Sequence, residues 1–144
     1  MAMISVLLDT NIILDVIARR EPFYAQSAAV WSAVESGIIH GMVAAHSVTT
    51  LYYLLSRQLT RQSAVQAISD LLRVFSIAPI DSKVIQDALA LAWHDFEDAV
   101  QATAALQAGA HYLVTRNIQD YPSSPIRVIS PKDLSAILHS PGLA

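Results

Sequence analysis

The chain contains no cysteine, and this absence removes disulfides, thiolate metal sites and cysteine nucleophiles together. Glycine is scarce, with four among 144 residues, and no glycine-rich loop of the kind that cradles phosphates is present. No apolar run approaches the roughly 20 residues that cross a bilayer. No basic segment followed by an apolar one opens the chain as an export signal would. We therefore expect a cytoplasmic globular protein that does not associate with membranes.

Charged residues are also few: they make up 15% of the chain, whereas hydrophobic residues make up 53%. The formal net charge of −3 gives no bulk electrostatic attraction to nucleic acid, although a local basic patch would suffice. Two explanations fit the high apolar fraction. A partner or a second copy of the chain would cover part of the apolar surface, or the core is built from alanine-rich helices.

The length is that of one domain, and we expect a single unit over residues 1–144 with a core from about 4 to 138. The two ends, Met1–Met3 and Ser140–Ala144, are expected to be loosely held.

Short apolar runs alternate with segments of helical periodicity. The expected strands cover 4–8, 38–44, 76–80, 112–115 and 127–129, and the expected helices 11–19, 24–36, 47–59, 61–75, 82–93, 96–108 and 131–139. This alternation predicts an α/β fold, with a parallel sheet of about five strands and helices on both faces.

Several helix ends carry their own signals. Thr60 and Ser130 stand where a helix N-cap is expected, and either Asp81 or Ser82 caps the helix that follows them. Gly109 comes directly after an alanine-rich helix, where a residue in the left-handed conformation commonly ends the helix.

The most informative segment is Ile4–Asn11, in which an apolar run ends abruptly in Asp9 and is followed by Thr10 and Asn11. This order places Asp9 at the carboxyl end of a buried strand, where open α/β sheets carry their chemistry. A carboxylate there loses solvation unless a metal ion, a cation or the N–H groups of a helix compensate its charge. Two interpretations therefore stay open: Asp9 or Thr10 caps the next helix, or Asp9 binds a metal ion, and these two roles are compatible with each other.

Two further acidic clusters occupy comparable places downstream. Asp95-Phe96-Glu97-Asp98 opens a helix, and Asn117 and Asp120 follow the strand expected at 112–115. Each has a structural explanation, since acids complement a helix dipole in its first turn and Asn and Asp are common in turns. However, neighbouring carboxylates repel one another, and a divalent cation with oxygen ligands removes that repulsion. Three acidic clusters at element ends together suggest a metal site.

The helix that begins near Asp98 has small residues, Ala99, Ala102 and Ala105, along one side. They would let it pack close to the sheet and turn Asp98 toward the strand ends. Arg116 lies beside the expected site and is a candidate for a bidentate phosphate contact, with a solvated loop position as the alternative. The five histidines show no metal-ligand spacing.

Taken together, the segments Leu8–Asn11, Asp95–Ala105 and Val114–Tyr121 resemble the PIN domain, the nuclease domain of VapC-type toxins in bacterial toxin–antitoxin pairs. The resemblance extends over about Ile4 to Leu138. It implies a three-layer α/β/α fold with strand order 3-2-1-4-5 and a switch point between the first and fourth strands. It further implies Mg²⁺- or Mn²⁺-dependent cleavage of RNA by metal-activated water, and an antitoxin protein as partner.

Carried over residue by residue, the resemblance makes Asp9, Asp98 and Asp120 the catalytic and metal-binding acids, with Thr10, Asn11 and Asn117 as supporting polar groups. From their positions beside Asp98, we further expect Asp95 to be an outer metal ligand and Glu97 to support the site. A homodimer is also expected, because the helices at 24–36 and 47–59 have large apolar faces.

One departure from the family pattern concerns the helix after the second strand. The family usually has a glutamate there, and the corresponding position in this chain is Tyr53. Either the extra acids Asp95 or Glu97 compensate, or the domain binds metal weakly or holds nucleic acid without cutting it.

A different class, the aspartyl phosphotransferases of the haloacid-dehalogenase type, would use Asp9 as a nucleophile. The sequence disfavours that class, because Asn11 stands where it has a second aspartate and no lysine lies near Asp120.

Overall fold

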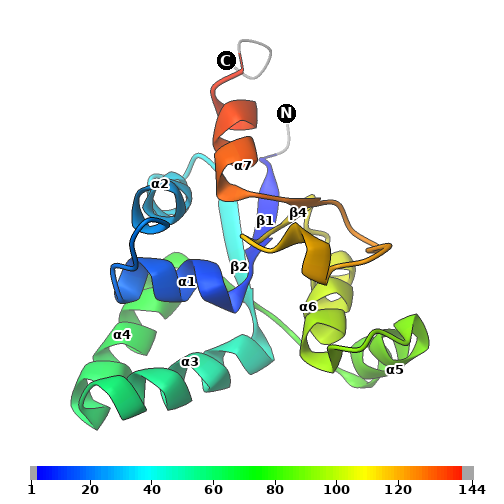
Figure 1. Cartoon of the computed structure of the whole chain (residues 1–144), viewed down its shortest axis with the longest axis horizontal. Coiled ribbons are helices and arrows are strands. Elements are labelled where there is room, and N and C mark those ends of the chain that lie inside the picture. Colours follow the sequence, from blue (N-terminus) through cyan, green and yellow to red (C-terminus); the bar gives the residue numbers. More distant parts are fainter. Residues whose placement is uncertain (1–2, 141–144) are drawn as a thin grey trace.

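The computed structural model describes residues 3–140, and our expectations for Met1, Ala2 and residues 141–144 lie outside that range. A five-stranded parallel sheet forms the middle layer (Figure 1). Its strands are β1 (Ser5–Leu8), β2 (His40–Ala44), β3 (Ser76–Ala78), β4 (Tyr112–Val114) and β5 (Val128–Ile129). They lie in the order β3-β2-β1-β4-β5, which confirms the predicted fold class and strand order.

Helices connect the strands on both sides of the sheet. Within residues 3–140 they are α1 (Thr10–Ile17), α2 (Tyr24–Glu35), α3 (Ala45–Gln58), α4 (Arg61–Val74), α5 (Ser82–Leu91), α6 (Phe96–Gln107), the 3-10 turn η1 (Ile118–Asp120) and α7 (Pro131–Leu138). None of the helices in this range is long and apolar enough to cross a membrane.

The alternation of side chains along β1 divides the core into two halves. Val6 and Leu8 pack on one face with α1, α2, α3, α4 and α7, whereas Leu7 packs on the other face with α5 and α6. Figure 1 shows α5 and α6 across the sheet from α1 and α2. All three side chains are fully buried, as expected for a central strand covered on both faces. Because α6 lies alone with α5 on its face, its packing against the sheet decides where its first turn lies.

Four of the predicted helix ends are confirmed. The side chains of Thr60, Asp81 and Ser130 each accept a hydrogen bond from a backbone N–H of the next helix turn, so Asp81 rather than Ser82 is the cap. Gly109 follows α6 with φ of +79°, in the left-handed region that glycine adopts without strain.

Element bounds differ from the prediction by one or two residues in most places, and two cases have a clear cause. Strand β3 ends at Ala78 because the next residue is Pro79, which has no N–H to continue the ladder. Helix α5 ends at Leu91 because Ala92 adopts the left-handed conformation with φ of +57°, which no glycine announces in the sequence.

Gly41 on β2 provides a test of the packing between the sheet and α2. A Cβ atom added at this position would lie 2.7 Å from Val34 Cγ1 and 2.8 Å from Phe75 Cδ1, closer than side chains approach one another. We expect Gly41→Ala to lower the free energy of unfolding by about 1–3 kcal/mol through overpacking, measured by urea denaturation. The exposed neighbour His40 provides the control, since His40→Ala should change stability little. An unchanged Gly41→Ala midpoint would contradict this packing.

Candidate active site

The acidic residues gather where β1 and β4 end. Leu8 pairs with Val114 in the parallel register, so the next residues, Asp9 and Thr115, leave the sheet side by side. The backbone N–H of Asp9 donates to the carbonyl of Val114 at 2.9 Å. In the strand order, β1 lies between β2 and β4, and the chain passes outward from β1 on both sides. This is the switch point of the sheet, where open α/β folds bind their ligands.

The carboxylate of Asp9 is only 7% exposed and accepts three side-chain hydrogen bonds. Thr115 Oγ1 donates to Oδ2 at 2.7 Å, and the Tyr121 hydroxyl donates to the same oxygen at 3.2 Å. Gln101 Nε2 donates to Oδ1 at 3.1 Å. Asp9 occupies the N-cap position of α1, but its side chain makes no capping bond there. Of the two roles left open by the sequence, side-chain capping is therefore wrong, and metal binding stays a prediction.

Tyr121 connects Asp9 to the second acid of the site. Its hydroxyl lies 3.2 Å from Asp9 Oδ2 and 3.4 Å from Asp98 Oδ1, and it accepts from Gln101 Nε2 at 2.8 Å. Burial, with the charges of Asp9 and Asp98, raises the pKa of Tyr121 above its ordinary value. The hydroxyl therefore stays protonated, and its single proton is available to one carboxylate at a time.

Asp98 reaches this position because α6 lies directly against the sheet. Ala99, Ala102 and Ala105 are all fully buried, which confirms the predicted close approach. Burial, followed by the charges of Asp95, Asp9 and Asp120, raises the pKa of Asp98 to about 7. The Tyr121 hydrogen bond acts in the opposite direction, because it stabilises the ionised form.

Two hollows adjoin Asp98. One, of about 200 Å³, is lined by residues of the β1–α1 junction, α3 and α6, among them Asp9, Thr10, Asn11, His46, Glu97, Asp98 and Gln101. We call it the acidic pocket. The other, of about 340 Å³, is lined by Trp93, His94, Asp95, Asp98, Gln119, Asp120 and Pro122. Asp98 is shared by both, so the structure brings Asp9 and Asp98 together and places Asp120 in the neighbouring hollow.

Across residues 3–140, no three His, Asp or Glu side chains lie close enough to hold a metal ion between them. The structure therefore shows no ready three-carboxylate cluster of Asp9, Asp98 and Asp120. Their assignment as metal ligands stays a prediction, and so does that of Asp95.

Some of the remaining predicted site residues line the acidic pocket, and others lie outside it. Asp95 accepts a hydrogen bond from the backbone N–H of Asp98 at 3.1 Å and thus caps α6. Thr10 donates to Ser47 Oγ at 2.9 Å, and the backbone N–H of Asn117 donates to Thr115 Oγ1 at 3.1 Å. Asn11 and Glu97 line the acidic pocket, whereas Asn117 lines neither hollow.

Tyr53, at the position where the family has a glutamate, lies outside the acidic pocket. Its side chain is 56% exposed and its hydroxyl accepts from Arg57 at 2.6 Å. The α3 residues that line the pocket are His46, Thr50 and Leu54 instead. Helix α3 thus contributes no carboxylate to the pocket.

Arg116 forms a buried ion pair rather than a solvated loop contact. Its Nε and Nη2 donate to the two carboxylate oxygens of Asp15 at 2.7 and 3.2 Å. The Asp15 side chain is 0% exposed and that of Arg116 is 19% exposed. The guanidinium also lies 3.8 Å from the centre of the Phe23 ring. The solvated position expected as an alternative is wrong, and the phosphate contact stays a prediction for a group already held by Asp15.

Sequence reasoning missed several residues of the site. Gln101 had a signal, because it is a large polar residue in an alanine-rich helix, three positions after Asp98. Thr115 had a signal too, since it directly follows β4 as Asp9 directly follows β1. Tyr121 and Ser47 had none, because their contacts depend on tertiary structure.

His46 was also missed. Its Nε2 donates to the carbonyl oxygen of Glu97 at 3.2 Å, which places the proton on Nε2 because a carbonyl only accepts. Its Nδ1 is buried, with no hydrogen-bond partner among residues 3–140. Burial lowers the pKa of His46, so the ring is neutral near pH 7 and joins the first turns of α3 and α6 without adding charge.

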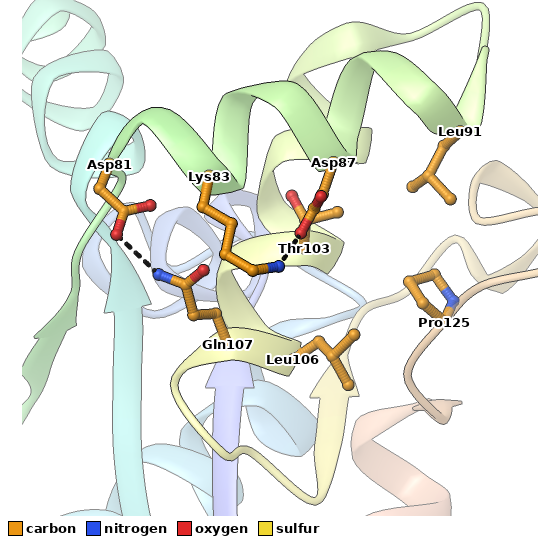
Figure 2. A pocket seen from close by; sticks show the side chains of 8 residues that line it. All are labelled: Asp81, Lys83, Asp87, Leu91, Thr103, Leu106, Gln107 and Pro125. Atoms are coloured by element: carbon orange, nitrogen blue, oxygen red, sulfur yellow. Dashed lines mark hydrogen bonds and ion pairs between the residues drawn. The ribbon is translucent and has the colours of Figure 1, made fainter.

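A larger groove of about 460 Å³ lies between α5 and α6, away from these acids (Figure 2). Leu91, Leu106 and Pro125 give it an apolar lining. On its rim, Lys83 Nζ bonds Asp87 at 2.6 Å and Gln107 bonds Asp81 at 3.0 Å. None of the predicted site residues lines this groove. Although it is larger than the acidic pocket, we therefore do not assign it as the active site.

The donors of the acidic pocket suit a hard divalent cation by their chemistry. Mg²⁺ commonly binds through one or two carboxylates and keeps several waters, so a cluster of three protein ligands is not required. Burial and the negative charges nearby raise the pKa of Asp98, and a cation beside it would offset those charges. Asp9 and Asp98 are the pair that the structure brings together for this purpose.

The fold and the pocket together define a three-layer α/β/α domain with an acidic site at the switch point of its sheet. Within that class, the chain belongs to the PIN domain family, whose family model matches residues 5–119. The family membership expected from the motifs is confirmed. No curated protein matches the chain.

Solved structures share the same fold. VapBC-1 from nontypeable Haemophilus influenzae is 15% identical with a TM-score of 0.71, covering 90% of this chain and 99% of its own. DNA-bound VapBC from Salmonella typhimurium is 17% identical with a TM-score of 0.68, covering 90% and 99%. VapC20 from Mycobacterium tuberculosis, a toxin that cleaves the sarcin–ricin loop, is 18% identical with a TM-score of 0.61, covering 75% and 86%.

The raised pKa of Asp98 predicts a pH-dependent gain in stability for Asp98→Asn in metal-free buffer. The folded protein holds the Asp98 proton up to about pH 7, whereas the unfolded chain releases it near 3.8, so this stabilising contribution is lost as the pH rises through that range. After discounting for its half-exposed position, we expect the variant to be more stable above pH 7 by about 1 kcal/mol, or about 3 °C in Tm.

Thermal melts in EDTA from pH 4 to pH 8 provide the measurement. The advantage of Asp98→Asn should grow between pH 4 and pH 7 and then level off, because the two states differ in bound protons only over that interval. The exposed Asp70→Asn is the matched control and should follow the wild type. A difference that does not vary with pH would show that Asp98 does not hold its proton in the folded protein.

The buried ion pair predicts that Arg116 matters for stability. Arg116→Met should lower the free energy of unfolding by about 3 kcal/mol, because it leaves the fully buried Asp15 carboxylate without its cation. The exposed pair of Arg73 and Asp70 supplies the comparison, and Arg73→Met should cost less than about 1 kcal/mol. Equal effects of the two substitutions in urea denaturation would contradict a structural role for Arg116.

Proposed function

We propose that this protein is a Mg²⁺- or Mn²⁺-dependent endoribonuclease that serves as the toxin of a toxin–antitoxin pair. The observation that carries the proposal is the pairing of Asp9 and Asp98 through the Tyr121 hydroxyl at the switch point of a PIN-domain sheet. Structural neighbours that include toxin–antitoxin complexes and a toxin that cleaves the sarcin–ricin loop support it. An antitoxin and a second copy of the chain are the protein partners that we propose.

In this proposal Asp9 and Asp98 hold the ion, and Asp95, Glu97 and Asp120 add negative charge around it. When bound, the ion supplies a Lewis acid that activates water and neutralises negative charge on the scissile phosphate. Attack by water needs no covalent protein nucleophile, which agrees with a chain that has no cysteine.

The lining of both hollows supports a dependence on metal. Neither the acidic pocket nor its neighbour has a lysine or an arginine among its lining residues. An RNA phosphate that approaches this pocket would meet the negative charge of Asp9 and, above about pH 7, that of Asp98, with no cationic side chain to offset them. A divalent cation is therefore the group that would allow the substrate to bind there. Thr10 and Asn11 line the same pocket and offer uncharged hydrogen-bonding groups.

A second function is a PIN domain that holds nucleic acid without cutting it. It is favoured by Tyr53, which stands exposed where the family has a glutamate, so that α3 gives the pocket no carboxylate. This reading predicts RNA retention with no cleavage at any Mn²⁺ concentration.

The proposal predicts that Asp9→Asn and Asp98→Asn each reduce Mn²⁺-dependent cleavage of a labelled RNA by about 100-fold or more, because each removes a charge that holds the ion. Both variants keep the shape of the side chain, so circular dichroism should be unchanged. Asp87→Asn, which alters an exposed acid paired with Lys83 on α5, is the control and should cleave as the wild type does.

Cleavage by the wild type should stop in EDTA and return with added Mn²⁺ or Mg²⁺. Equal cleavage in EDTA and in Mn²⁺ would exclude the metal-dependent mechanism. RNA binding by gel shift, without cleavage in either buffer, would favour the non-cutting function.

A further inference from the structure

Gln101 is a buried side chain with a carboxamide group, and it is one of the residues that line the acidic pocket. It is 2% exposed and all of its polar groups have partners. Its Nε2 donates to Asp9 Oδ1 at 3.1 Å and to the Tyr121 oxygen at 2.8 Å, while its Oε1 accepts from Ser47 Oγ at 3.0 Å. Because a carboxylate only accepts, the amide nitrogen must face Asp9, and the hydroxyl of Ser47 holds the other end of the amide in place.

The network continues from Gln101 through Ser47 to Thr10, the residue after Asp9. Thr10 Oγ1 donates to Ser47 Oγ at 2.9 Å, so hydroxyl protons point in sequence from Thr10 to Ser47 and from Ser47 to Gln101. Ser47 is 1% exposed and is not among the residues that line the acidic pocket. Ser47 is thus connected to the acidic pocket by the bond that it donates to the Gln101 amide and by the bond that it accepts from Thr10, which lines the pocket.

This arrangement fixes two of the groups on which the site depends. The Gln101 amide limits the rotation of the Asp9 carboxylate, whose other oxygen is held by Thr115. The same amide donates to the oxygen of Tyr121, which directs the hydroxyl proton toward Asp9 and Asp98. One side chain therefore determines both the orientation of Asp9 and the hydroxyl that lies between the two acids.

The sequence around Gln101 argues against a role in packing alone. Its neighbours Ala102, Ala104 and Ala105 are fully buried, so small apolar residues suit this side of α6. Burying a carboxamide costs free energy unless every polar atom is bonded.

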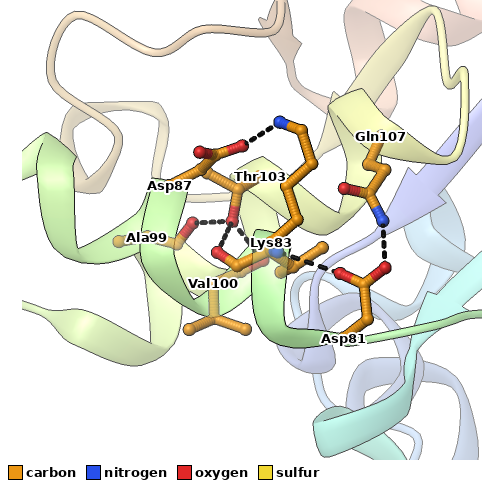
Figure 3. Close-up of polar contacts among 8 residues, drawn as sticks. Asp81, Lys83, Asp87, Ala99, Val100, Thr103 and Gln107 are labelled. Atoms are coloured by element: carbon orange, nitrogen blue, oxygen red, sulfur yellow. Dashed lines mark hydrogen bonds and ion pairs between the residues drawn. The ribbon is translucent and has the colours of Figure 1, made fainter.

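Thr103, also buried on α6, shows the contrast. Among residues 3–140, the hydrogen-bond partners of its hydroxyl are all backbone carbonyl oxygens, those of Ala99, Val100 and Val84, at 2.9, 3.1 and 3.3 Å (Figure 3).

We propose that Gln101 is a positioning residue, oriented by Ser47, which holds Asp9 and the Tyr121 hydroxyl so that Asp9 and Asp98 present their oxygens to one divalent cation. The inference rests on the proposed metal-dependent function and adds the residues that prepare its site. Gln101 acts through the ligands, as the hydrogen-bond partners of metal ligands do in other sites.

Calorimetric titration of the full chain with MnCl₂ tests the proposal without any measurement of activity. Gln101→Met fills a similar volume and removes the amide, and we expect it to raise the Kd for Mn²⁺ about 10- to 100-fold. Ser47→Ala leaves the amide in place but frees its orientation, and we expect a rise of about two- to tenfold. Thr103→Val is the matched control, because it removes a buried hydroxyl from the same helix, and its Kd should stay within about twofold of the wild type.

The double variant Ser47→Ala/Gln101→Met should bind Mn²⁺ like Gln101→Met alone, since Ser47 acts through the amide. A wild-type Kd in Gln101→Met would overturn the inference and leave the proposed function intact. If Gln101→Met does not fold, an unchanged Kd in Ser47→Ala overturns it instead. A wild type that binds no Mn²⁺ would exclude the metal-dependent function and this inference with it.

Discussion

The negative charge of the Asp9 carboxylate is the constraint on which much of this structure depends. A carboxylate that is nearly buried at the end of a strand is unfavourable unless hydrogen-bond donors replace the water that it has lost. Three donors do so here, and they come from the end of β4, from the middle of α6 and from the residue after η1. The pairing of β1 with β4 and the closeness of α6 to the sheet are therefore conditions for the acidic pocket as well as features of the fold.

A second buried carboxylate connects α1 to the loop after β4. Asp15 on α1 is fully buried and pairs with Arg116, which follows Thr115 at the end of β4. The pair thus joins the helix that begins after Asp9 to the loop that leads to Asp120 and Tyr121. Both buried carboxylates occur where β1 and β4 leave the sheet, and each is matched by donors rather than left to solvent. The loop after β4 is therefore bonded to Asp9 through Tyr121 and to Asp15 through Arg116.

Much of the fold follows from local patterns in the sequence. The apolar run before Asp9 predicted β1, and capping residues such as Thr60 and Ser130 marked helix starts because their bonds span three residues. The spacing of Ala99, Ala102 and Ala105 indicated that Asp98 would face the strand ends. Their burial also supports the explanation of the high apolar fraction by an alanine-rich core.

The contacts that complete the site could not be predicted in this way. Thr115, Gln101 and Tyr121 meet Asp9 across 106, 92 and 112 positions, so no local pattern records their convergence. Arg116 illustrates the same limit, because its partner Asp15 is 101 positions away and a local reading left only phosphate or solvent for it. Tyr53 was identified from the family pattern, but its exposed position depends on how α3 packs.

The alanines of α6 have a consequence for how the chain tolerates change. They are the surface through which α6 rests on the sheet, and the same helix carries Asp98 in its first turn. A larger side chain at Ala102 or Ala105 would push the helix outward and separate Asp98 from Asp9, although it would touch neither acid. An aliphatic substitution at either alanine would therefore impair the proposed nuclease function, although neither alanine belongs to the polar residues of the acidic pocket. In this fold, small alanine side chains determine where the acidic side chains lie.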